Sequence, residues 1–238
     1  MNREPPTWLE TLRLDLREFT PEDIGELVRL DSDPRVLKYI NGGRPMPRSE
    51  IDAAMRRVMR YYALYPGLGV WRASLRGNGR FIGWYCLKYC PPTTDIEVGY
   101  RLLHAHWGRG YATEGARALV DYAFDDLGLN RVLGVTHPGN KASQHVLQKA
   151  GLSDLGWGNY YDRRLRLFAC ERAPDRRGWG LTARRGRTKR GNGSRPRAKA
   201  CRSSSTGHRL CPWRPRRRPT RMRCRHSCHP KRPRSGAY

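Results

Sequence analysis

Residues 106–114 read His-Trp-Gly-Arg-Gly-Tyr-Ala-Thr-Glu and join two stretches of different periodicity. Before them, apolar and polar residues alternate over residues 94–102, as on a half-buried β-strand. After them, apolar residues recur every three or four positions over residues 112–127, which predicts an amphipathic helix. Gly108 and Gly110 permit consecutive backbone N–H groups to converge on an anion at the positive end of that helix. The segment therefore predicts a phosphate cradle between a strand and a helix.

Two common nucleotide-binding motifs do not fit this segment. A P-loop carries Lys followed by Ser or Thr after its last glycine, whereas Tyr111 and Ala112 follow Gly110 here. A dinucleotide-binding loop needs a third small residue, at the position that Thr113 holds, and an acidic residue about twenty positions further on. The nearest acidic pair, residues 125–126, comes too early and lies in the predicted helix.

The segment resembles the cofactor loop of the GNAT acetyltransferase superfamily, which reads Gln/Arg-x-x-Gly-x-Gly/Ala before a long helix. Trp107 replaces the first polar residue. The resemblance continues through Glu97-Val98-Gly99-Tyr100, Asn140-Lys141-Ala142-Ser143 and Lys149-Ala150-Gly151-Leu152. It covers roughly residues 8–172 and is similar to the branch that acetylates the N-termini (alanine) of ribosomal proteins.

The resemblance implies that acetyl-coenzyme A binds as the acetyl donor, with its pyrophosphate on the N–H groups of the loop. In the family, the pantetheine arm lies between the strand before the loop and the strand after the helix, where the two separate near a bulge. Gly99 is the implied bulge residue, with a close helix contact as the alternative explanation for this glycine. The implied cofactor-binding residues are Leu102, Leu103, Gly108, Arg109, Gly110, Tyr111, Ala112, Thr113 and Asn140.

Acetyl transfer to an amine requires a neutral amine, a polarised thioester carbonyl and a protonated or otherwise stabilised thiolate. Glu97 is the best-placed carboxylate to accept the amine proton, directly or through water, and Asp95 is a weaker substitute. The alternative for Glu97 is a solvated carboxylate on the polar face of the strand.

Few residues are candidates for the acid that would protonate the departing thiolate. Many superfamily members have a tyrosine acid seven residues after the asparagine that matches Asn140, but Leu147 stands at that position. In the branch that this chain resembles, Ser143 can approach the thiol, so Ser143 is the candidate proton donor, ahead of Tyr160 or Tyr161. Asn140 is expected to bond the pantetheine or a nearby water, and N-capping is its alternative role.

Local signals place the remaining elements. Capping boxes at residues 20–23 and 49–52 predict two helix starts, and the Asn-Gly dipeptide at residues 78–79 predicts a β-hairpin. We expect strands near residues 12–16, 69–75, 81–90, 94–102, 131–136, 152–157 and 165–172, and helices near residues 20–28, 49–62, 112–127 and 140–150. This order predicts an α/β (mixed α+β) fold, with a mixed, mostly antiparallel sheet and helices on both faces.

Charge divides the chain into two parts. The whole sequence carries +26, but residues 1–172 hold 25 Lys/Arg and 20 Asp/Glu, a net +5, whereas residues 173–238 hold 22 and 1, a net +21. We therefore expect one acetyltransferase-like domain over residues 1–172 and a disordered Arg/Pro-rich tail over residues 173–238.

Three interpretations of the tail compete. It could bind nucleic acid non-specifically through counterion release, or hold zinc through Cys211, Cys224, Cys228 and His229. It could also be an out-of-frame translation product, because shifted GC-rich codons encode such Arg/Pro/Gly/Ser/Cys mixtures. We favour the third interpretation, since the family pattern stops abruptly after Arg172.

Composition limits the remaining functions. The N-terminal residues lack the apolar core of a signal peptide, and no apolar run is long enough to span a bilayer, so we expect a cytoplasmic protein without membrane contacts. Seven cysteines do not form a disulfide framework, and residues 1–172 show no metal-ligand spacing. The sequence predicts an N-acetyltransferase acting on a peptide N-terminus or a small-molecule amine. The alternative is a nucleic-acid-binding protein with a non-catalytic scaffold, and the oligomeric state stays open.

Overall fold

A computed structural model describes residues 6–172. The strands are β1 (Leu9–Glu10), β2 (Leu14–Glu18), β3 (Gly69–Leu75), β4 (Phe81–Tyr89), β5 (Ile96–Leu102), β6 (Arg131–Thr136), β7 (Ser153–Tyr160) and β8 (Arg163–Glu171). The helices are α1 (Ile24–Asp31), α2 (Pro34–Asn41), α3 (Arg48–Leu64), α4 (Tyr111–Asp125) and α5 (Lys141–Lys149), with short 3-10 turns η1 (Pro21–Asp23) and η2 (His104–His106). No helix within these residues is both long and apolar enough to cross a membrane. The expectations for residues 173–238 lie outside the described residues.

The eight strands form one sheet in the order β1-β2-β3-β4-β5-β6-β8-β7. Each neighbouring pair is antiparallel except β5 and β6, which are parallel and are linked through α4. The predicted hairpin of β3 and β4 and the predicted strand-helix-strand crossover are both present. The expectation of a mixed, mostly antiparallel sheet is therefore confirmed.

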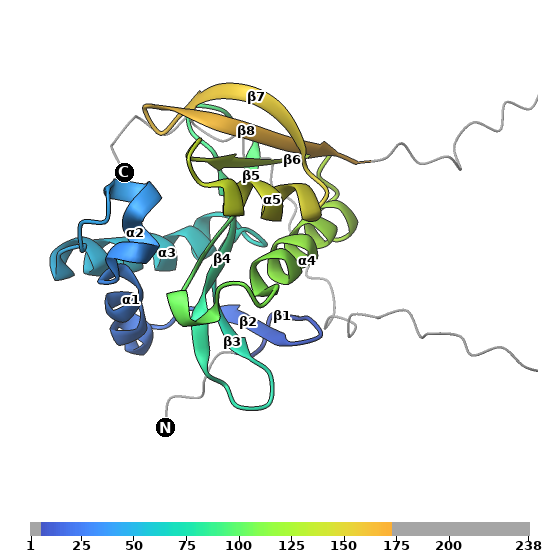
Figure 1. Cartoon of the computed structure of the whole chain (residues 1–238). Coiled ribbons are helices and arrows are strands. Elements are labelled where there is room, and N and C mark those ends of the chain that lie inside the picture. Colours follow the sequence, from blue (N-terminus) through green and yellow to red (C-terminus); the bar gives the residue numbers. More distant parts are fainter. Residues whose placement is uncertain (1–5, 173–238) are drawn as a thin grey trace, which may run out of the picture. The chain divides into compact units, whose positions relative to one another are not determined.

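Helices cover both faces of the sheet (Figure 1). One core lies under α4 and α5, and a second lies under α1, α2 and α3. Because side chains alternate along a strand, neighbouring residues serve different cores. Trp71 and Tyr85 belong to the first core, whereas Val70 and Trp84 pack against the second.

Three local expectations need correction. Leu12 does not face the core but lies 86% exposed between β1 and β2. The capping box at Ser49 does not form, because the N-cap of α3 is Pro47, two residues earlier, and Asp52 instead pairs with Arg48 at 2.9 Å. The expected helices omitted α2, although Asp33 caps it and Pro34 occupies its first position.

Helix α4 packs unusually close to the sheet. A Cβ on Gly115 would lie 2.3 Å from the ring of Tyr85, so only glycine permits this approach. The Tyr85 hydroxyl donates to the carbonyl oxygen of Tyr111 at 2.7 Å. These two contacts set the position of the first turn of α4 relative to β4.

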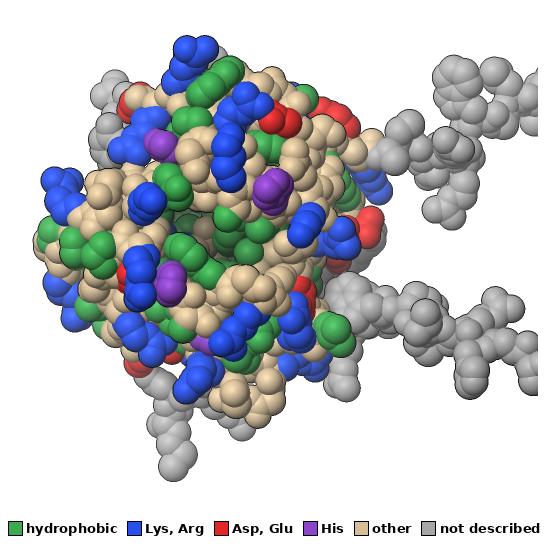
Figure 2. Space-filling view, in the orientation of Figure 1, with side chains coloured by type: hydrophobic (Ala, Val, Ile, Leu, Met, Phe, Trp, Pro, Cys, Tyr) green, Lys and Arg blue, Asp and Glu red, His purple; other side chains and the backbone are tan. Residues whose placement is uncertain are grey.

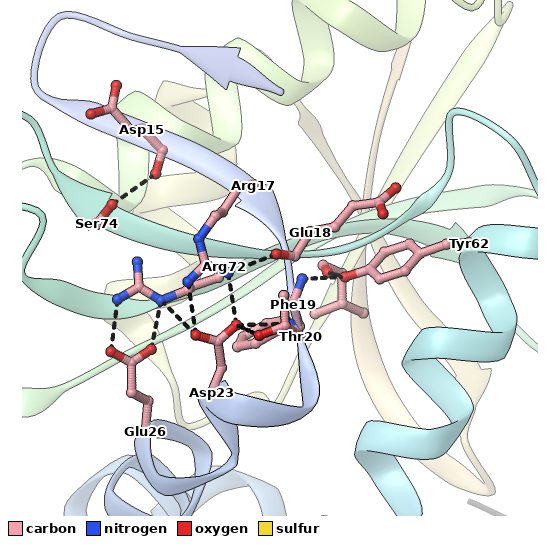
Figure 3. A network of polar contacts seen from close by, with 11 residues as sticks. Asp15, Arg17, Glu18, Phe19, Thr20, Asp23, Glu26, Tyr62, Arg72 and Ser74 are labelled. Atoms are coloured by element: carbon pink, nitrogen blue, oxygen red, sulfur yellow. Dashed lines mark hydrogen bonds and ion pairs between the residues drawn. The ribbon is translucent and has the colours of Figure 1, made fainter. Parts of the chain in front are cut away.

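A buried ionic network joins β2, β3 and α1 (Figure 3). The Arg17 guanidinium donates to both oxygens of Asp23, at 2.7 and 2.8 Å, and the Thr20 N–H also donates to this carboxylate, at 2.8 Å. Arg72 pairs with Glu26 at 2.6 Å and with Asp23 at 3.4 Å. Burial alone would raise the pKa of Asp23, but the bonds and charges from Arg17, Thr20 and Arg72 outweigh burial and lower it.

The Asp23→Asn variant is expected to lower the free energy of unfolding by about 3 kcal/mol at pH 7, since it leaves buried guanidinium groups without a counter-charge. The pKa of Asp23 is lower in the folded state than the unfolded value near 3.9, so its contribution is complete above about pH 5 and declines as the pH falls through the folded pKa. Urea unfolding at several pH values measures both effects.

The exposed pair Arg48 and Asp52 provides the control. Asp52→Asn is expected to change stability by less than about 0.5 kcal/mol. A difference between wild type and Asp23→Asn that stays constant down to pH 3 would show that the carboxylate charge does not stabilise this network.

Candidate active site

Strands β5 and β6 separate soon after they begin. Their parallel pairing has one register pair, Glu97 with Leu133, whereas β4 stays paired with β5 from Ile96 to Leu102 and β8 stays paired with β6 throughout. The edge of β5 that faces β6 therefore has no strand partner beyond Glu97 among the described residues. The result is a gap whose two walls are β5 and β6, followed by α4 and α5.

The surface is hollowed near the middle of the face seen in Figure 2, between α2 and α3 on one side and α4 and α5 on the other. Hydrophobic side chains lie within this hollow, and Lys, Arg and His side chains surround it (Figure 2). An apolar interior with a basic rim suits a ligand that has an uncharged arm and an anionic end.

The loop before α4, in which the sequence predicts an anion cradle, ends at the N-terminus of the helix. Gly110 is the N-cap of α4 with φ +81°, and the first bond within the helix runs from the Glu114 N–H to the Gly110 carbonyl oxygen at 3.0 Å. The N–H groups of Tyr111, Ala112 and Thr113 thus have no acceptor within the helix. They point out of the positive end of its dipole.

Both loop glycines have backbone conformations that favour glycine. Gly108 has φ +72°, and a Cβ there would meet nothing within 4 Å, so the loop is open on that side. A Cβ on Gly110 would lie 3.3 Å from Nη2 of Arg13. The open side of Gly108 is the space that an anion needs in order to approach the free N–H groups.

Arg13, the residue directly before β2, contacts the loop and holds it in place. Its guanidinium donates to the Arg109 carbonyl at 3.0 Å, pairs with Glu114 at 2.6 Å and lies 4.5 Å from the centre of the Tyr111 ring. Thr11 also donates to Glu114, at 2.6 Å. Sequence reasoning missed these contacts because about a hundred residues separate the partners.

The contacts of Glu114 with Thr11 and Arg13 affect the pKa of its carboxyl group. Burial alone would raise it, but the hydrogen bonds from Thr11 and Arg13 and the Arg13 charge outweigh burial and lower it. A negative side chain in the first turn of α4 therefore faces Arg13 and leaves the free N–H groups to a ligand.

His106 shows that the loop lies in a positive field. The side chain is 7% exposed, and its Nδ1 has no hydrogen-bond partner among the described residues. Burial lowers the pKa of His106, and the charges of Arg109, Arg80 and Arg29 lower it further. The same arginine charges would attract a bound anion.

Part of the expected pantetheine edge is already hydrogen-bonded. The Trp107 indole N–H donates to the Leu102 carbonyl at 2.8 Å, and the Leu103 N–H donates to the Ile82 carbonyl at 2.8 Å. Trp107 thus anchors the loop to the end of β5. The Leu103 carbonyl accepts the His106 N–H at 2.9 Å, so each of these two carbonyls has only its second lone pair left for a ligand.

The prediction of a bulge at Gly99 is wrong. Pairing of β4 with β5 passes through Gly99 opposite Cys86 without a register shift. A Cβ on Gly99 would lie 2.9 Å from the Cys86 sulfur, so the glycine serves a close contact with the neighbouring strand rather than with a helix. The gap therefore arises from the parting of β5 and β6, without a bulge in β5.

Asn140 and Ser143 lie at the start of α5, on the far wall of the gap. The Asn140 side chain accepts the Ser143 N–H at 3.1 Å, so it caps the helix. The Tyr100 hydroxyl, on β5, donates to Ser143 Oγ at 3.1 Å. One hydrogen bond therefore spans the space between the two walls.

Glu97 lies on the other face of β5 and is not solvated. It is 6% exposed, and its Oε1 lies 2.5 Å from the Lys88 ammonium and accepts the hydroxyl of Tyr161. Burial alone would lower the pKa of Lys88, but Glu97 outweighs it and raises the pKa. Burial and the Glu97 charge raise the pKa of Tyr161 well above its usual range, so this phenol stays a donor.

Sequence reasoning did not identify Lys88 as the partner of Glu97. The pairing of β4 with β5 places Lys88 directly opposite Glu97, and this register was a detectable signal once the hairpin and the next strand were recognised. Tyr161 comes from the turn between β7 and β8, which no local pattern links to β5.

Comparison with known proteins agrees with this geometry. Residues 13–153 match the model of the acetyltransferase (GNAT) domain. Over 163 residues the chain is 37% identical to FsC-acetyl coenzyme A-N(2)-transacetylase of Aspergillus fumigatus, which covers 65% of this chain and 68% of that protein. The acetyltransferase of Agrobacterium tumefaciens has a similar structure, with 26% identity, a TM-score of 0.62 and coverage of 72% of this chain and 98% of that chain. The ribosomal L7/L12 α-N-protein acetyltransferase RimL, solved with coenzyme A, shares the fold at 13% identity, with a TM-score of 0.58 and coverage of 68% and 95%.

Gly110→Glu is expected to abolish the thermal stabilisation that coenzyme A produces, because its carboxylate would stand beside the free N–H groups and repel the pyrophosphate. Gly77→Glu is the control, since Gly77 also has a positive φ (+86°) but lies in open surroundings in the β3–β4 turn. Differential scanning fluorimetry with and without coenzyme A measures the shift. Equal stabilisation of the two variants would show that the loop does not hold the pyrophosphate.

Proposed function

The chain belongs to the GNAT acetyltransferase family and is an acetyl-coenzyme A-dependent N-acetyltransferase, and from this premise we propose that it transfers the acetyl group directly to a primary amine in a ternary complex. The parting of β5 and β6 after a single register pair is the observation that carries this proposal. A thioester can enter along one wall while an amine enters from the other face, so no acetylated enzyme is needed.

The donor would be held by backbone more than by side chains. Acetyl-coenzyme A supplies an activated acyl group, and the N–H groups from Gly108 to Thr113, with the Arg109 charge, would bind its pyrophosphate. Hydrogen bonds to charged groups contribute about 1.5 to 3 kcal/mol each, so three of them could supply much of the affinity. Leu102, Leu103 and the Asn140 amide nitrogen would bond the pantetheine.

Glu97 is proposed as the group that receives the amine proton. Its carboxylate carries the only negative charge among Glu97, Lys88 and Tyr161, and Glu97 itself is buried beside the point where the strands part. The Tyr161 hydroxyl and ordered water could relay the proton to it. Lys88 balances the carboxylate charge and keeps it oriented.

The reaction moves one proton overall. The amine nitrogen attacks the thioester carbonyl, a C–N bond forms, and the C–S bond breaks with its electron pair on sulfur. The proton that leaves the nitrogen passes through Glu97 or water and finally reaches the sulfur. Ser143, on the thiol side of the gap, is proposed as the nearest hydroxyl to that sulfur.

The acceptor is proposed to be a peptide N-terminus or a small-molecule amine. The name of the Aspergillus relative specifies an N(2)-transacetylase, and the name of RimL specifies the α-N position of a ribosomal protein. Identity is 37% for the former and 13% for the latter, so sequence similarity gives more support to a small-molecule amine.

Release of free thiol tests the proposal. With acetyl-coenzyme A and a panel of peptide N-termini, polyamines and amino-sugar amines, the full chain is expected to release thiol only in the presence of its acceptor. Mass spectrometry of the acceptor should show one added acetyl group. Thiol release without any acetylated amine would contradict direct transfer, as would a lack of turnover with all of these amine classes.

Glu97→Gln is expected to lower kcat by about 100-fold or more while KM for acetyl-coenzyme A changes little, because general base catalysis typically contributes factors of this size. Asp95→Asn, which removes a carboxylate just before β5, is expected to stay within about twofold of wild type. Steady-state kinetics give both values.

A second variant separates chemistry from folding. Glu97→Gln leaves the Lys88 ammonium buried without its partner, whereas Glu97→Gln combined with Lys88→Met removes both charges. The double variant is expected to recover thermal stability but not activity. Recovery of both would mean that Glu97 has only a structural role.

A further inference from the structure

Among the described residues, Tyr100 and Ser143 form the one side-chain hydrogen bond that crosses the gap between β5 and α5. Tyr100 lies three residues beyond Glu97, on the part of β5 that has no strand partner on the β6 side, and Ser143 lies in the first turn of α5. Nothing in the local sequence pairs them, because forty-three positions separate the two residues. Their contact depends on how α5 packs after β6.

The Tyr100 hydroxyl donates this hydrogen bond, and Ser143 Oγ accepts it. Burial raises the pKa of Tyr100 to about 12, although the bond to Ser143 opposes the shift. Tyr100 therefore keeps its proton at neutral pH, and that proton is available for donation to Ser143 Oγ. The hydroxyl proton of Ser143 has no acceptor among residues 6–172, and a hydroxyl whose lone pair is occupied turns its proton away from the donor.

The first turn of α5 holds the serine in place. The Asn140 side chain accepts the Ser143 N–H at 3.1 Å, and Gly134 lets Leu147 approach β6 so closely that a Cβ would lie 2.6 Å from its side chain. The backbone of Ser143 is thereby fixed, and its hydroxyl orientation is the remaining freedom. Tyr100 removes that freedom from the opposite wall.

We propose that Tyr100 is a positioning residue that orients the Ser143 hydroxyl as a hydrogen-bond donor to the sulfur of coenzyme A. The proposal rests on the function proposed above, because that function places the thioester in this gap. Tyr100 touches neither the sulfur nor the acetyl group and acts through Ser143.

The acidities decide between donation of a hydrogen bond and donation of a proton. An alkyl thiol ionises near pKa 8.5, well below the value of about 12 for Tyr100, so complete transfer of the tyrosine proton to the thiolate is unfavourable by about three orders of magnitude. A hydrogen bond needs no such transfer. One bond to an ionised group is expected to lower the thiol pKa by about one.

The pKa of the coenzyme A thiol, bound to the full chain, tests the proposal without an acceptor amine. The ultraviolet absorbance of the thiolate, followed as a function of pH, reports it. In wild type the bound thiol should have a pKa about one lower than free coenzyme A. Tyr100→Phe, which removes only the hydroxyl, should raise the pKa of the bound thiol most of the way back to that of free coenzyme A.

Further variants give the thermodynamic cycle. Ser143→Ala should abolish the difference, Ser143→Thr should retain it, and Ser143→Ala combined with Tyr100→Phe should equal Ser143→Ala alone. Tyr89→Phe, at the far end of β4, is the matched control and should behave as wild type. In turnover, Tyr100→Phe should lower kcat by about tenfold without raising KM for acetyl-coenzyme A.

Each failure has a separate signature. If coenzyme A neither binds nor stabilises wild type, the function proposed above fails. If it binds but its thiol titrates as in free solution, or if Tyr100→Phe leaves the thiol pKa at the wild-type value while Ser143→Ala raises it, the positioning role of Tyr100 is overturned. Thermal unfolding of each variant verifies that it is folded.

Discussion

The single register pair between β5 and β6, Glu97 with Leu133, is the constraint on which the site depends. Each of these strands keeps full pairing with its other neighbour, so the sheet consists of two stiff parts that diverge from one point. Helix α4 follows β5, and α5 follows β6. The divergence therefore brings two helix N-termini to the two sides of one gap, and close contacts at Gly115 and Gly134 hold each helix against its own part of the sheet.

The period-two geometry of β5 divides the chemistry between the two faces of the sheet. Glu97 points toward Lys88 and Tyr161 on one face, whereas Tyr100 points toward Ser143 on the other. An odd spacing of three residues makes this separation unavoidable. The proposed proton acceptor and the proposed thiol-side hydroxyl thus lie on opposite faces of the sheet, which suits a reaction between two substrates that enter from different sides.

Much of the fold was predictable because its signals are local. The Asn-Gly turn, the alternation in β5, the glycines of the loop and the periodicity of α4 each act within a few residues, and all of these elements are present. The prediction of a capping box at Ser49 was wrong because Pro47 already permits the helix to start two residues earlier. The burial of Glu97 and the contact of Arg13 with Glu114 were not predictable, since each depends on partners brought together by tertiary pairing. The roles of the cofactor-loop residues and of Glu97 and Ser143 stay predictions.

The turn between β7 and β8 illustrates why the acceptor preference cannot be predicted from any short segment of the sequence. Tyr161 and Asp162 have φ values of +52° and +54°, conformations that cost a non-glycine residue about 1 kcal/mol or more. Type I′ turns usually relieve this strain with Asn-Gly, so this turn must be held by other contacts. The Tyr161 hydroxyl bonds Glu97, and Arg163 donates to the Ile40 carbonyl on α2 at 2.6 Å. In the function proposed above, the walls on the amine side would come from β5, α2 and this hairpin, and a change in any one of them would alter the space for the amine.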